Sequence, residues 1–378
     1  MKKISLILLF VMLESLTIAQ EATFKQIEAL LHKELSKENI HNVFLSVYSP
    51  TRGIEWHAAK GTFHDGTEVT TDNPFYTASV GKTFTATAIG MLVDRGLIGF
   101  NDRIASYLPA DVMAGLHVYE GVDYGDSITV AHLLRHTSGL PDYFSPNTVD
   151  GTPGMFDLIM TAPNRFWQPE ELIAFSKAHF KPGFAPGTGY FYTDTEFVLL
   201  GMIVENVSGL ALHEFFELNM FIPLKMVHTY LNQRSEPEQP TLPMAEMYAG
   251  SHELSSLKSL SADWAGGAVV ATGKDLIVFL NALMNGKLVS AATLGQMQQW
   301  IAETQGMAYG FGSRKIDFTE LDSGLPNFVA IGHAGGNGTI MYYCPDLDIY
   351  LTGTLNQLEA TKSAVILMAT VLVLCQGL

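Results

Sequence analysis

The sequence predicts an α+β fold, in which a mixed α/β lobe has an antiparallel sheet flanked by helices and carries an inserted helical lobe. Two runs near the start of the chain, 41–48 and 54–59, have strand-like character and are joined by a Ser-Pro-Thr-Arg-Gly turn, a pattern typical of a hairpin. Further strand-like runs lie near the end of the chain, at 328–331, 339–343 and 349–355. Strands at both ends of a mostly helical chain favour one sheet built from the two termini.

The helices are predicted from the spacing of apolar residues. Segments 24–31 and 80–92 have apolar residues at helical spacing, and residues 110–290 alternate helical patches with loops rich in Gly and Pro. The apolar run 364–375 is too short for a bilayer, which needs about 20 residues, so we expect a helix buried against the sheet. These elements predict one domain over 20–378. Its α/β lobe covers about 20–110 and 290–378, and its helical lobe covers about 111–289.

The first nineteen residues have the pattern of a signal peptide. Lys2 and Lys3 precede the apolar run 4–13, and the small residues Thr17 and Ala19 suit a cleavage site. Glu14 places a negative charge at the end of the apolar run, which does not fit this pattern well. A buried N-terminal helix is the alternative interpretation. We therefore expect a secreted or periplasmic protein with residues 1–19 removed and no stable insertion into a membrane.

The composition excludes several classes of protein. Hydrophobic residues make up 47% of the 378 residues, which is enough for a sizeable core and too much for a disordered chain. With 22 basic and 38 acidic residues, the net charge of −16 argues against binding to nucleic acid, which needs clustered Lys and Arg. The two cysteines, Cys344 and Cys375, cannot form a disulfide framework and show no zinc-ligand spacing, so we expect buried thiols and no metal.

A Ser-x-x-Lys pattern is the first candidate for chemistry, and it occurs twice. Ser79 and Lys82 lie where a strand-like run meets an amphipathic helix, whereas Ser255 and Lys258 lie between polar turns. Residues three apart share a helix face, so Lys82 can reach the Ser79 hydroxyl, and the helix start favours a developing oxyanion. The alternative is an N-cap serine followed by a solvated lysine.

Two later motifs decide between these interpretations. Tyr192-Thr193-Asp194 follows a Gly-rich loop, and His333-Ala334-Gly335-Gly336 ends a strand-like run. With Ser79-x-x-Lys82, their order and separation resemble the class C β-lactamase-like serine hydrolases of the serine β-lactamase and penicillin-binding-protein superfamily. The resemblance extends from about residue 25 to the C-terminus. It implies the β-lactamase/transpeptidase-like fold. The family that it points to includes D,D-carboxypeptidases, D-aminopeptidases and esterases.

The resemblance implies a role for each motif residue. Ser79 is the expected nucleophile of an acyl-enzyme, and Lys82 and Tyr192 are the expected partners that take its proton. Lys82 at its ordinary pKa of about 10.4 is protonated at neutral pH, and the sequence leaves open whether Lys82 or Tyr192 is the base. The backbone N–H groups of Ser79 and Gly336 are the expected oxyanion hole.

Two departures from the family pattern bear on the substrate. Asp194 stands where the family most often has Asn; it can hold the Lys82 ammonium but cannot donate to a substrate carbonyl. In the third motif His333 replaces the commoner Lys, and Ala334 replaces a hydroxyl residue beside Gly335. A neutral imidazole and a methyl group form a poor carboxylate receptor, so these supporting residues favour substrates without a carboxylate beside the scissile bond.

The sequence therefore predicts a serine hydrolase that acts through an acyl-serine on esters or amides and needs no cofactor. A D-amino-acid peptidase or a weak β-lactamase is the alternative within the family. A catalytically silent protein that binds peptidoglycan or β-lactams is the alternative of another class. The expected partner is a small ester, amide or D-peptide substrate, and the oligomeric state is not predicted.

Overall fold

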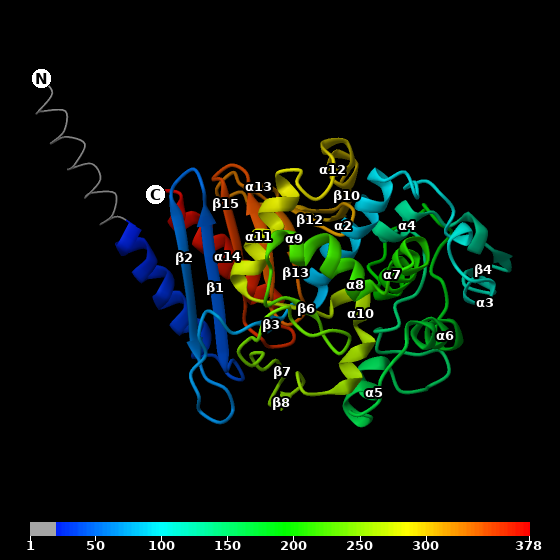
Figure 1. The fold of residues 1–378 in the computed structure, drawn as a ribbon, viewed down its shortest axis with the longest axis horizontal. Coiled ribbons are helices and arrows are strands. Elements are labelled where there is room, and N and C mark those ends of the chain that lie inside the picture. The colour runs from blue at the N-terminus through cyan, green and yellow to red at the C-terminus, as the bar shows by residue number, and fades with distance from the viewer. Residues whose placement is uncertain (1–19) are drawn as a thin grey trace, which may run out of the picture.

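The structure is a computed structural model that describes residues 20–378, so the predicted signal peptide lies outside the described residues. An eight-stranded antiparallel sheet forms one side of the molecule (Figure 1). Its strands, in spatial order, are β10 (Ile301–Thr304), β11 (Met307–Tyr309), β12 (Arg314–Asp317), β13 (Val329–Ala334), β14 (Ile340–Cys344), β15 (Ile349–Thr354), β1 (Asn42–Ser49) and β2 (Ile54–Gly61). The N-terminal hairpin pairs with the C-terminal strands through β1 and β15, with Phe44 opposite Thr354. The expectation of one sheet from both termini is confirmed.

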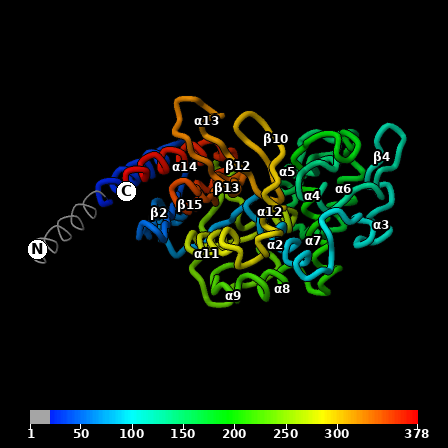
Figure 2. The backbone as a smooth tube through the Cα atoms, turned by 90° about the horizontal axis from the view of Figure 1, so that it is seen from above, coloured from blue at the N-terminus to red at the C-terminus, as the bar shows by residue number. Residues whose placement is uncertain are grey.

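Helices cover both faces of this sheet. Val43 and Leu45 of β1 point to one face, where the N-terminal helix over 20–35 and α14 (Thr361–Cys375) complete a core, and these two helices lie side by side in Figures 1 and 2. Phe44 points to the other face, which packs against α11 (Gly273–Met284). Because strand side chains alternate between faces, β1 is buried on both of them. Helix α11 falls within the range expected for the helical lobe, yet it covers the sheet.

The helical part of the molecule is built around α2 (Gly81–Asp94) and α7 (Asp194–Ser208), which contact each other and the short α10 (Trp264–Gly267). Most residues of α2 and α7 are buried, so each helix packs against its neighbours on nearly every side. Helix α2 covers most of the segment 80–92, where the sequence predicts a helix. Shorter helices complete this part of the molecule: α3 (Ala110–Met113), α4 (Val130–Leu134), α5 (Met155–Thr161), α6 (Pro169–His179), α8 (Leu212–Phe216), α9 (Ile222–Leu224) and α12 (Ala291–Met297). Helix α13 (Phe318–Leu321) instead packs beside β12 of the large sheet.

Three small sheets within residues 20–378 lie outside the eight-stranded sheet. A three-stranded sheet places β9 (Val269–Ala271) between β3 (Phe75–Tyr76) and β6 (Tyr230–Leu231). Two hairpins stand apart from it, β4 (Val118–Tyr119) with β5 (Val122–Asp123) and β7 (Tyr248–Ala249) with β8 (His252–Glu253). Strand β3 leads directly into the segment that carries Ser79, so this sheet fixes where that residue lies.

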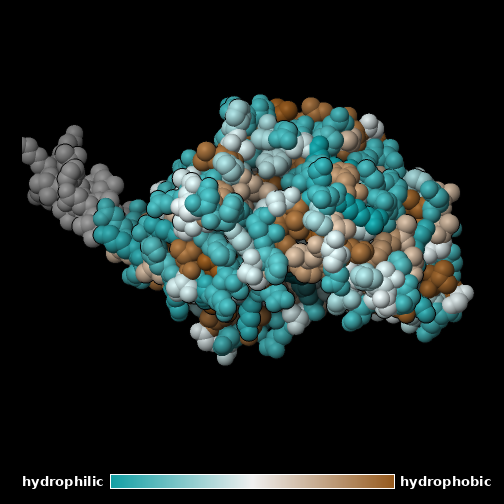
Figure 3. Space-filling model, turned by 90° about the horizontal axis from the view of Figure 1, so that it is seen from below, coloured by the Kyte–Doolittle hydropathy of each residue, from teal (hydrophilic) through white to brown (hydrophobic). Residues whose placement is uncertain are grey.

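The surface of the described residues is mixed in character. Figure 3 shows apolar side chains in separate patches among hydrophilic ones on the face seen from below. Across residues 20–378, no single helix has both the length and the apolar composition to cross a membrane; α7 and Leu212–Leu224 pass that test only as a pair bent by 75°. Cys344 and Cys375 are free and buried, as the sequence predicts.

Candidate active site

Ser79 lies at the junction between β3 and α2, in a short 3-10 turn over Ala78–Val80. The amide and hydroxyl of Thr77 both donate to the carbonyl oxygen of Val269, at 2.9 and 2.8 Å, which ties the junction to β9. Ala78 has a φ of +47°, in the left-handed region that a residue with a Cβ adopts only when its surroundings hold it there. This bend leaves Ser79 half-buried at a helix start, where backbone N–H groups lack helical acceptors.

Two glycines allow the chain to close around this junction. A Cβ on Gly335, just after β13, would lie 2.6 Å from the carbonyl oxygen of Thr77. A Cβ on Gly267, at the end of α10, would lie 2.7 Å from the carbonyl carbon of Ala78. Neither position has room for a side chain, so both glycines are required by close backbone approach. The end of β13 and the end of α10 thus press against the Ser79 turn from two directions.

Lys82 is completely buried on the first turn of α2, and its Nζ reaches Ser79. Nζ lies 3.3 Å from the Ser79 Oγ and donates to the carbonyl oxygen of Gly266 at 3.0 Å and to the carboxylate of Asp194. Burial alone would lower the pKa of Lys82, but the negative charge of Asp194, with Tyr192 and Asp263, raises it above its ordinary value. Lys82 is therefore an ammonium group that contacts the Ser79 hydroxyl.

Tyr192 lies on the other side of Lys82. The Lys82 Nζ is 5.0 Å from the centre of the Tyr192 ring, and the buried Tyr192 hydroxyl has no hydrogen-bond partner of ordinary geometry among the described residues. Burial raises the pKa of Tyr192, and Lys82, Arg314 and the nearby Ser79 hydroxyl act in the opposite direction without reversing the shift. An unpaired phenol next to Ser79 can exchange a proton with it.

Three carboxyl groups lie near the Lys82 ammonium, and one of them, Asp194, contacts it. Asp142 Oδ1 accepts from the backbone N–H of Asp194 at 3.1 Å, and Asp263 accepts from the Tyr76 hydroxyl at 3.0 Å. Burial and the charge of Asp194 raise the pKa of both Asp142 and Asp263 to about 7. The site therefore contains more acidic groups than Lys82 alone can neutralise. The sequence singled out Asp194 but neither of the other two.

The third motif contributes a neutral histidine. His333 is completely buried; its Nδ1 donates to the carbonyl oxygen of Ala334 at 2.8 Å, which leaves Nε2 to accept from the Tyr309 hydroxyl at 3.0 Å. Burial, together with the charges of Arg314 and Lys82, lowers the pKa of His333 well below its ordinary value. His333 thus brings no charge to the site. Gly336 follows in an exposed position, and its N–H has no acceptor among residues 20–378.

A second buried histidine, His136, holds the turn that carries Tyr192. His136 bonds to Glu196 through Nδ1 at 2.5 Å, accepts from the backbone N–H of Thr193 at 3.3 Å, and packs its ring 4.3 Å from the Tyr192 ring. Burial raises the pKa of Glu196 and lowers that of His136, so this pair is a neutral carboxylic acid and a neutral imidazole. Its position agrees with a role in fixing the turn that carries Tyr192.

The structure also brings Arg314 to the site, a residue for which the sequence has no motif. Arg314 on β12 forms two hydrogen bonds of 2.7 Å with Glu303 on β10, and its guanidinium lies 4.9 Å from the centre of the Tyr192 ring. Pairing across β10–β12 creates this contact, so a search for short motifs cannot find it.

The residues predicted from the three motifs are brought together. Around Ser79 lie Lys82, Tyr192, Asp194, His333, Ala334, Gly335 and Gly336. The second Ser-x-x-Lys copy lies elsewhere: the Ser255 Oγ accepts from the Met247 N–H at 2.6 Å, and Lys258 is exposed. Within the described part of the chain, no group of three or more His, Cys, Asp or Glu side chains is arranged to hold a metal ion.

Known proteins are similar to this chain in sequence and in fold. Penicillin-binding protein 4* of Bacillus subtilis (strain 168) is 31% identical over 177 residues, which are 45% of this chain and 33% of that protein. A putative D-alanyl-D-alanine carboxypeptidase of Escherichia coli (strain K12) is 24% identical over 77% of this chain and 71% of its own length. A crystal structure of a D-stereospecific amidohydrolase from Streptomyces sp. is 25% identical, with a TM-score of 0.73, over 91% of this chain and 97% of that one.

The sequence matches cover 45% and 77% of this chain, and the structural match covers 91%. The chain spans only a third of the length of penicillin-binding protein 4*, and about seven-tenths of the putative carboxypeptidase. The family model described as Beta-lactamase matches residues 33–373, which include the Ser79 turn, the Tyr192 loop and the end of β13. The chain therefore belongs to the Beta-lactamase family of serine hydrolases.

Proposed function

We propose that this protein hydrolyses its substrate through an acyl group carried on Ser79. The observation that carries the proposal is the contact of the half-buried Ser79 Oγ with the Lys82 Nζ, 3.3 Å away, in a site that Tyr192 completes. The Ser79 oxygen attacks the carbonyl carbon, its proton passes to the base, and the carbonyl oxygen becomes an oxyanion. The N–H groups of Ser79 and Gly336 receive that oxyanion, and such a donor typically lowers the barrier by about 3 kcal/mol.

We propose Tyr192 as the base of this reaction. Asp194 keeps Lys82 protonated, so the ammonium has no lone pair to offer. When Tyr192 has lost its proton to solvent, its phenolate accepts the Ser79 proton and later returns it to the departing alcohol or amine. Water then cleaves the acyl ester and frees Ser79. Because the pKa of Tyr192 is raised, this assignment predicts activity that increases with pH into the alkaline range.

The proposed substrates are amides or esters of amino acids, with the D configuration preferred. A neutral His333 and the methyl group of Ala334 offer no anion receptor in the third motif, and an amino acid amide or ester has no free carboxylate at its scissile bond. The likeness to a D-stereospecific amidohydrolase supports the D configuration. A D,D-carboxypeptidase is the second candidate, and the likeness to a putative D-alanyl-D-alanine carboxypeptidase supports it.

Covalent labelling tests the nucleophile. A fluorophosphonate probe should label the wild type and the Ser255→Ala variant, but not Ser79→Ala. Ser255→Ala is the matched control because Ser255 begins the other Ser-x-x-Lys pattern. Equal labelling of Ser79→Ala and wild type would contradict the assignment. Absence of labelling in the wild type would favour a catalytically silent binding protein.

A side-by-side substrate screen tests the substrate class. D-alanine p-nitroanilide and D-phenylalanine amide should be hydrolysed faster than their L counterparts, and p-nitrophenyl esters should also react. Peptides ending in D-Ala-D-Ala and the β-lactam nitrocefin carry a carboxylate and should react poorly. Strong turnover of nitrocefin would show that the third motif does not exclude carboxylates.

We also propose that the protein is exported after cleavage behind Ala19, from the basic start, apolar run and small residues of 1–19. Intact-mass measurement of the protein from its native host should then give a chain that begins at Gln20. A mature protein that still begins at Met1 would contradict the proposal.

A further inference from the structure

The environment of Tyr192 contains few groups that carry charge. The polar and titratable side chains near it on neighbouring elements are Ser79, Lys82, His136, Tyr190, Asp194, Tyr309, Arg314, His333 and Tyr342. Burial lowers the pKa of His136 and His333 and raises that of Tyr190, Tyr309 and Tyr342, so these five are neutral. Lys82, Asp194 and Arg314 remain as the charged groups, and Glu303 joins them through its ion pair with Arg314.

The charge of Lys82 is already offset within the site. Its Nζ contacts the carboxylate of Asp194, and the acidic Asp142 and Asp263 lie behind that pair. A phenolate on Tyr192 would add a further negative charge to this acidic cluster. Lys82 alone is therefore a weak stabiliser of the phenolate, and a second cation is needed.

Arg314 occupies the position of that second cation. Its guanidinium carbon lies 4.9 Å from the centre of the Tyr192 ring and 5.4 Å from that of Tyr309. The pair of 2.7 Å bonds to Glu303 fixes the guanidinium plane, and the Arg314 side chain is only 15% exposed. Arginine remains charged in such a place, where lysine or histidine can lose a proton.

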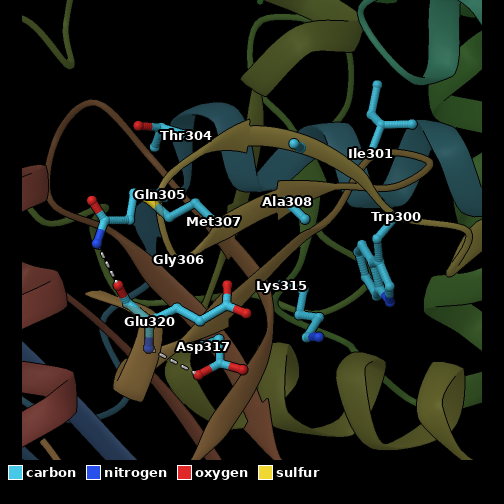
Figure 4. A pocket seen from close by; sticks show the side chains of 11 residues that line it. Trp300, Ile301, Thr304, Gln305, Gly306, Met307, Ala308, Lys315, Asp317 and Glu320 are labelled. Carbon is cyan, nitrogen blue, oxygen red and sulfur yellow. Dashed lines mark hydrogen bonds between the residues drawn. The ribbon is translucent and has the colours of Figure 1, made fainter. Parts of the chain in front are cut away.

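The sheet holds Arg314 on the side that faces Tyr192. Its neighbour Lys315 points to the opposite side of β12, as expected for successive strand residues. There Lys315 and Asp317 line a separate pocket of about 480 Å³ under the β10–β11 hairpin (Figure 4). That pocket therefore belongs to the other face of the hairpin, and Arg314 serves the site at Tyr192.

We propose that Arg314, clamped by Glu303, is a positioning residue that stabilises the phenolate of Tyr192 while the Ser79 proton is transferred to it. The guanidinium compensates for the positive charge that His333 does not supply. The inference rests on the proposed role of Tyr192 as the base. It assigns opposite effects to the two members of the ion pair, because Arg314 favours the phenolate and Glu303 opposes it.

The experiment measures fluorophosphonate labelling and hydrolysis of an uncharged p-nitrophenyl ester from about pH 6 to about pH 10.5. In Arg314→Gln the rise in rate should move to higher pH by about one unit, which means roughly tenfold slower labelling at pH 7.5. Arg314→Lys should recover most of the shift. Glu303→Gln should move the rise to lower pH. The double variant, Arg314→Gln with Glu303→Gln, keeps a neutral hydrogen-bonding pair and should still shift to higher pH.

Three results would overturn the inference. One is an unchanged pH profile in a folded double variant, with melting temperature as the check on folding. Another is a shift in the same direction for Glu303→Gln and Arg314→Gln. The third is an increase in KM confined to substrates that bear a carboxylate, which would make Arg314 a substrate receptor instead. Ser79→Ala separates these outcomes from failure of the proposed function. Activity in that variant would contradict the acyl-serine mechanism itself, whatever the role of Arg314.

Discussion

At the scale of single residues, the site is organised by where negative charge is placed. Asp194 stands at the first position of α7, where it contacts Lys82, and its backbone N–H binds Asp142. An asparagine in this position would hold Lys82 by a neutral oxygen. The carboxylate instead raises the pKa of both Lys82 and Tyr192, so both groups retain their protons to higher pH. The identity of this one residue therefore sets the pH range in which Ser79 is activated.

Asp194→Asn should move the rise in kcat/KM to lower pH. Removing the carboxylate removes a negative charge that raises the pKa of Lys82 and adds to the effect of burial on Tyr192, so both lose a proton more easily. We expect a shift of about one pH unit or more, read from the profile for an uncharged ester. Asp72→Asn is the control, because Asp72 forms an exposed ion pair with Lys274 at 2.8 Å. An Asp194→Asn profile that coincides with wild type would contradict this account.

At the scale of elements, the site depends on three segments that meet without room for side chains. The Ser79 turn, the end of α10 and the end of β13 approach through Gly81, Gly267 and Gly335. A Cβ on Gly81 would lie 2.8 Å from the Cα of Gly267, so the start of α2 is packed against α10 by backbone contact. These glycines therefore act by lacking a side chain, which lets the three backbone segments come into contact. They bring Lys82 and the oxyanion donors to one place.

Gly267→Ala should lower both stability and activity. Its Cβ would lie 2.3 Å from Asp263 Oδ2 and 2.7 Å from the Ala78 carbonyl carbon, so the Ser79 turn must move. Overpacking of this kind costs about 1–3 kcal/mol, which denaturant unfolding would measure. Gly295→Ala is the matched control within α12: nothing lies within 4 Å of its Cβ, so it should gain about 0.5–1 kcal/mol. Equal unfolding free energies for the two variants would contradict the packing argument.

The parts of the molecule that sequence patterns could predict are those with local signals. The hairpin of β1 and β2, the strands β13–β15 and the helices α2 and α14 appear within a few residues of their expected positions. The spacing of Ser79 and Lys82 is also a local signal, whereas Tyr192 was placed beside them by the family resemblance of the three motifs. Strands β10–β12 were not predicted because they are short and half-exposed, and their pairing decides their structure. Arg314 and Glu303 come from those strands, so the sequence could not reveal them.

At the scale of the whole molecule, two cores support one site. One core lies between the sheet, the N-terminal helix and α14, and the other fills the helical part and reaches the opposite face of the sheet. Thr361, at the start of α14, donates to the carbonyl oxygen of Gly335 at 2.8 Å. Leu372 lies eleven residues further along the helix, about 16 Å away at 1.5 Å per residue. The far end of α14 therefore affects stability without contact with the site.

Leu372→Ala should lower the free energy of unfolding by about 2–5 kcal/mol while leaving the labelling rate of Ser79 unchanged at 25 °C. Leu372 is 1% exposed in the core beneath the sheet, and its truncation leaves a cavity there. Ile366→Ala on the same helix is the control: Ile366 is 56% exposed, so its loss should change stability by about 0.5 kcal/mol or less. Urea unfolding gives the first quantity and fluorophosphonate kinetics the second. If Leu372→Ala slowed labelling of the folded protein, the two cores would be coupled through the sheet, and the far end of α14 would affect the site as well as stability.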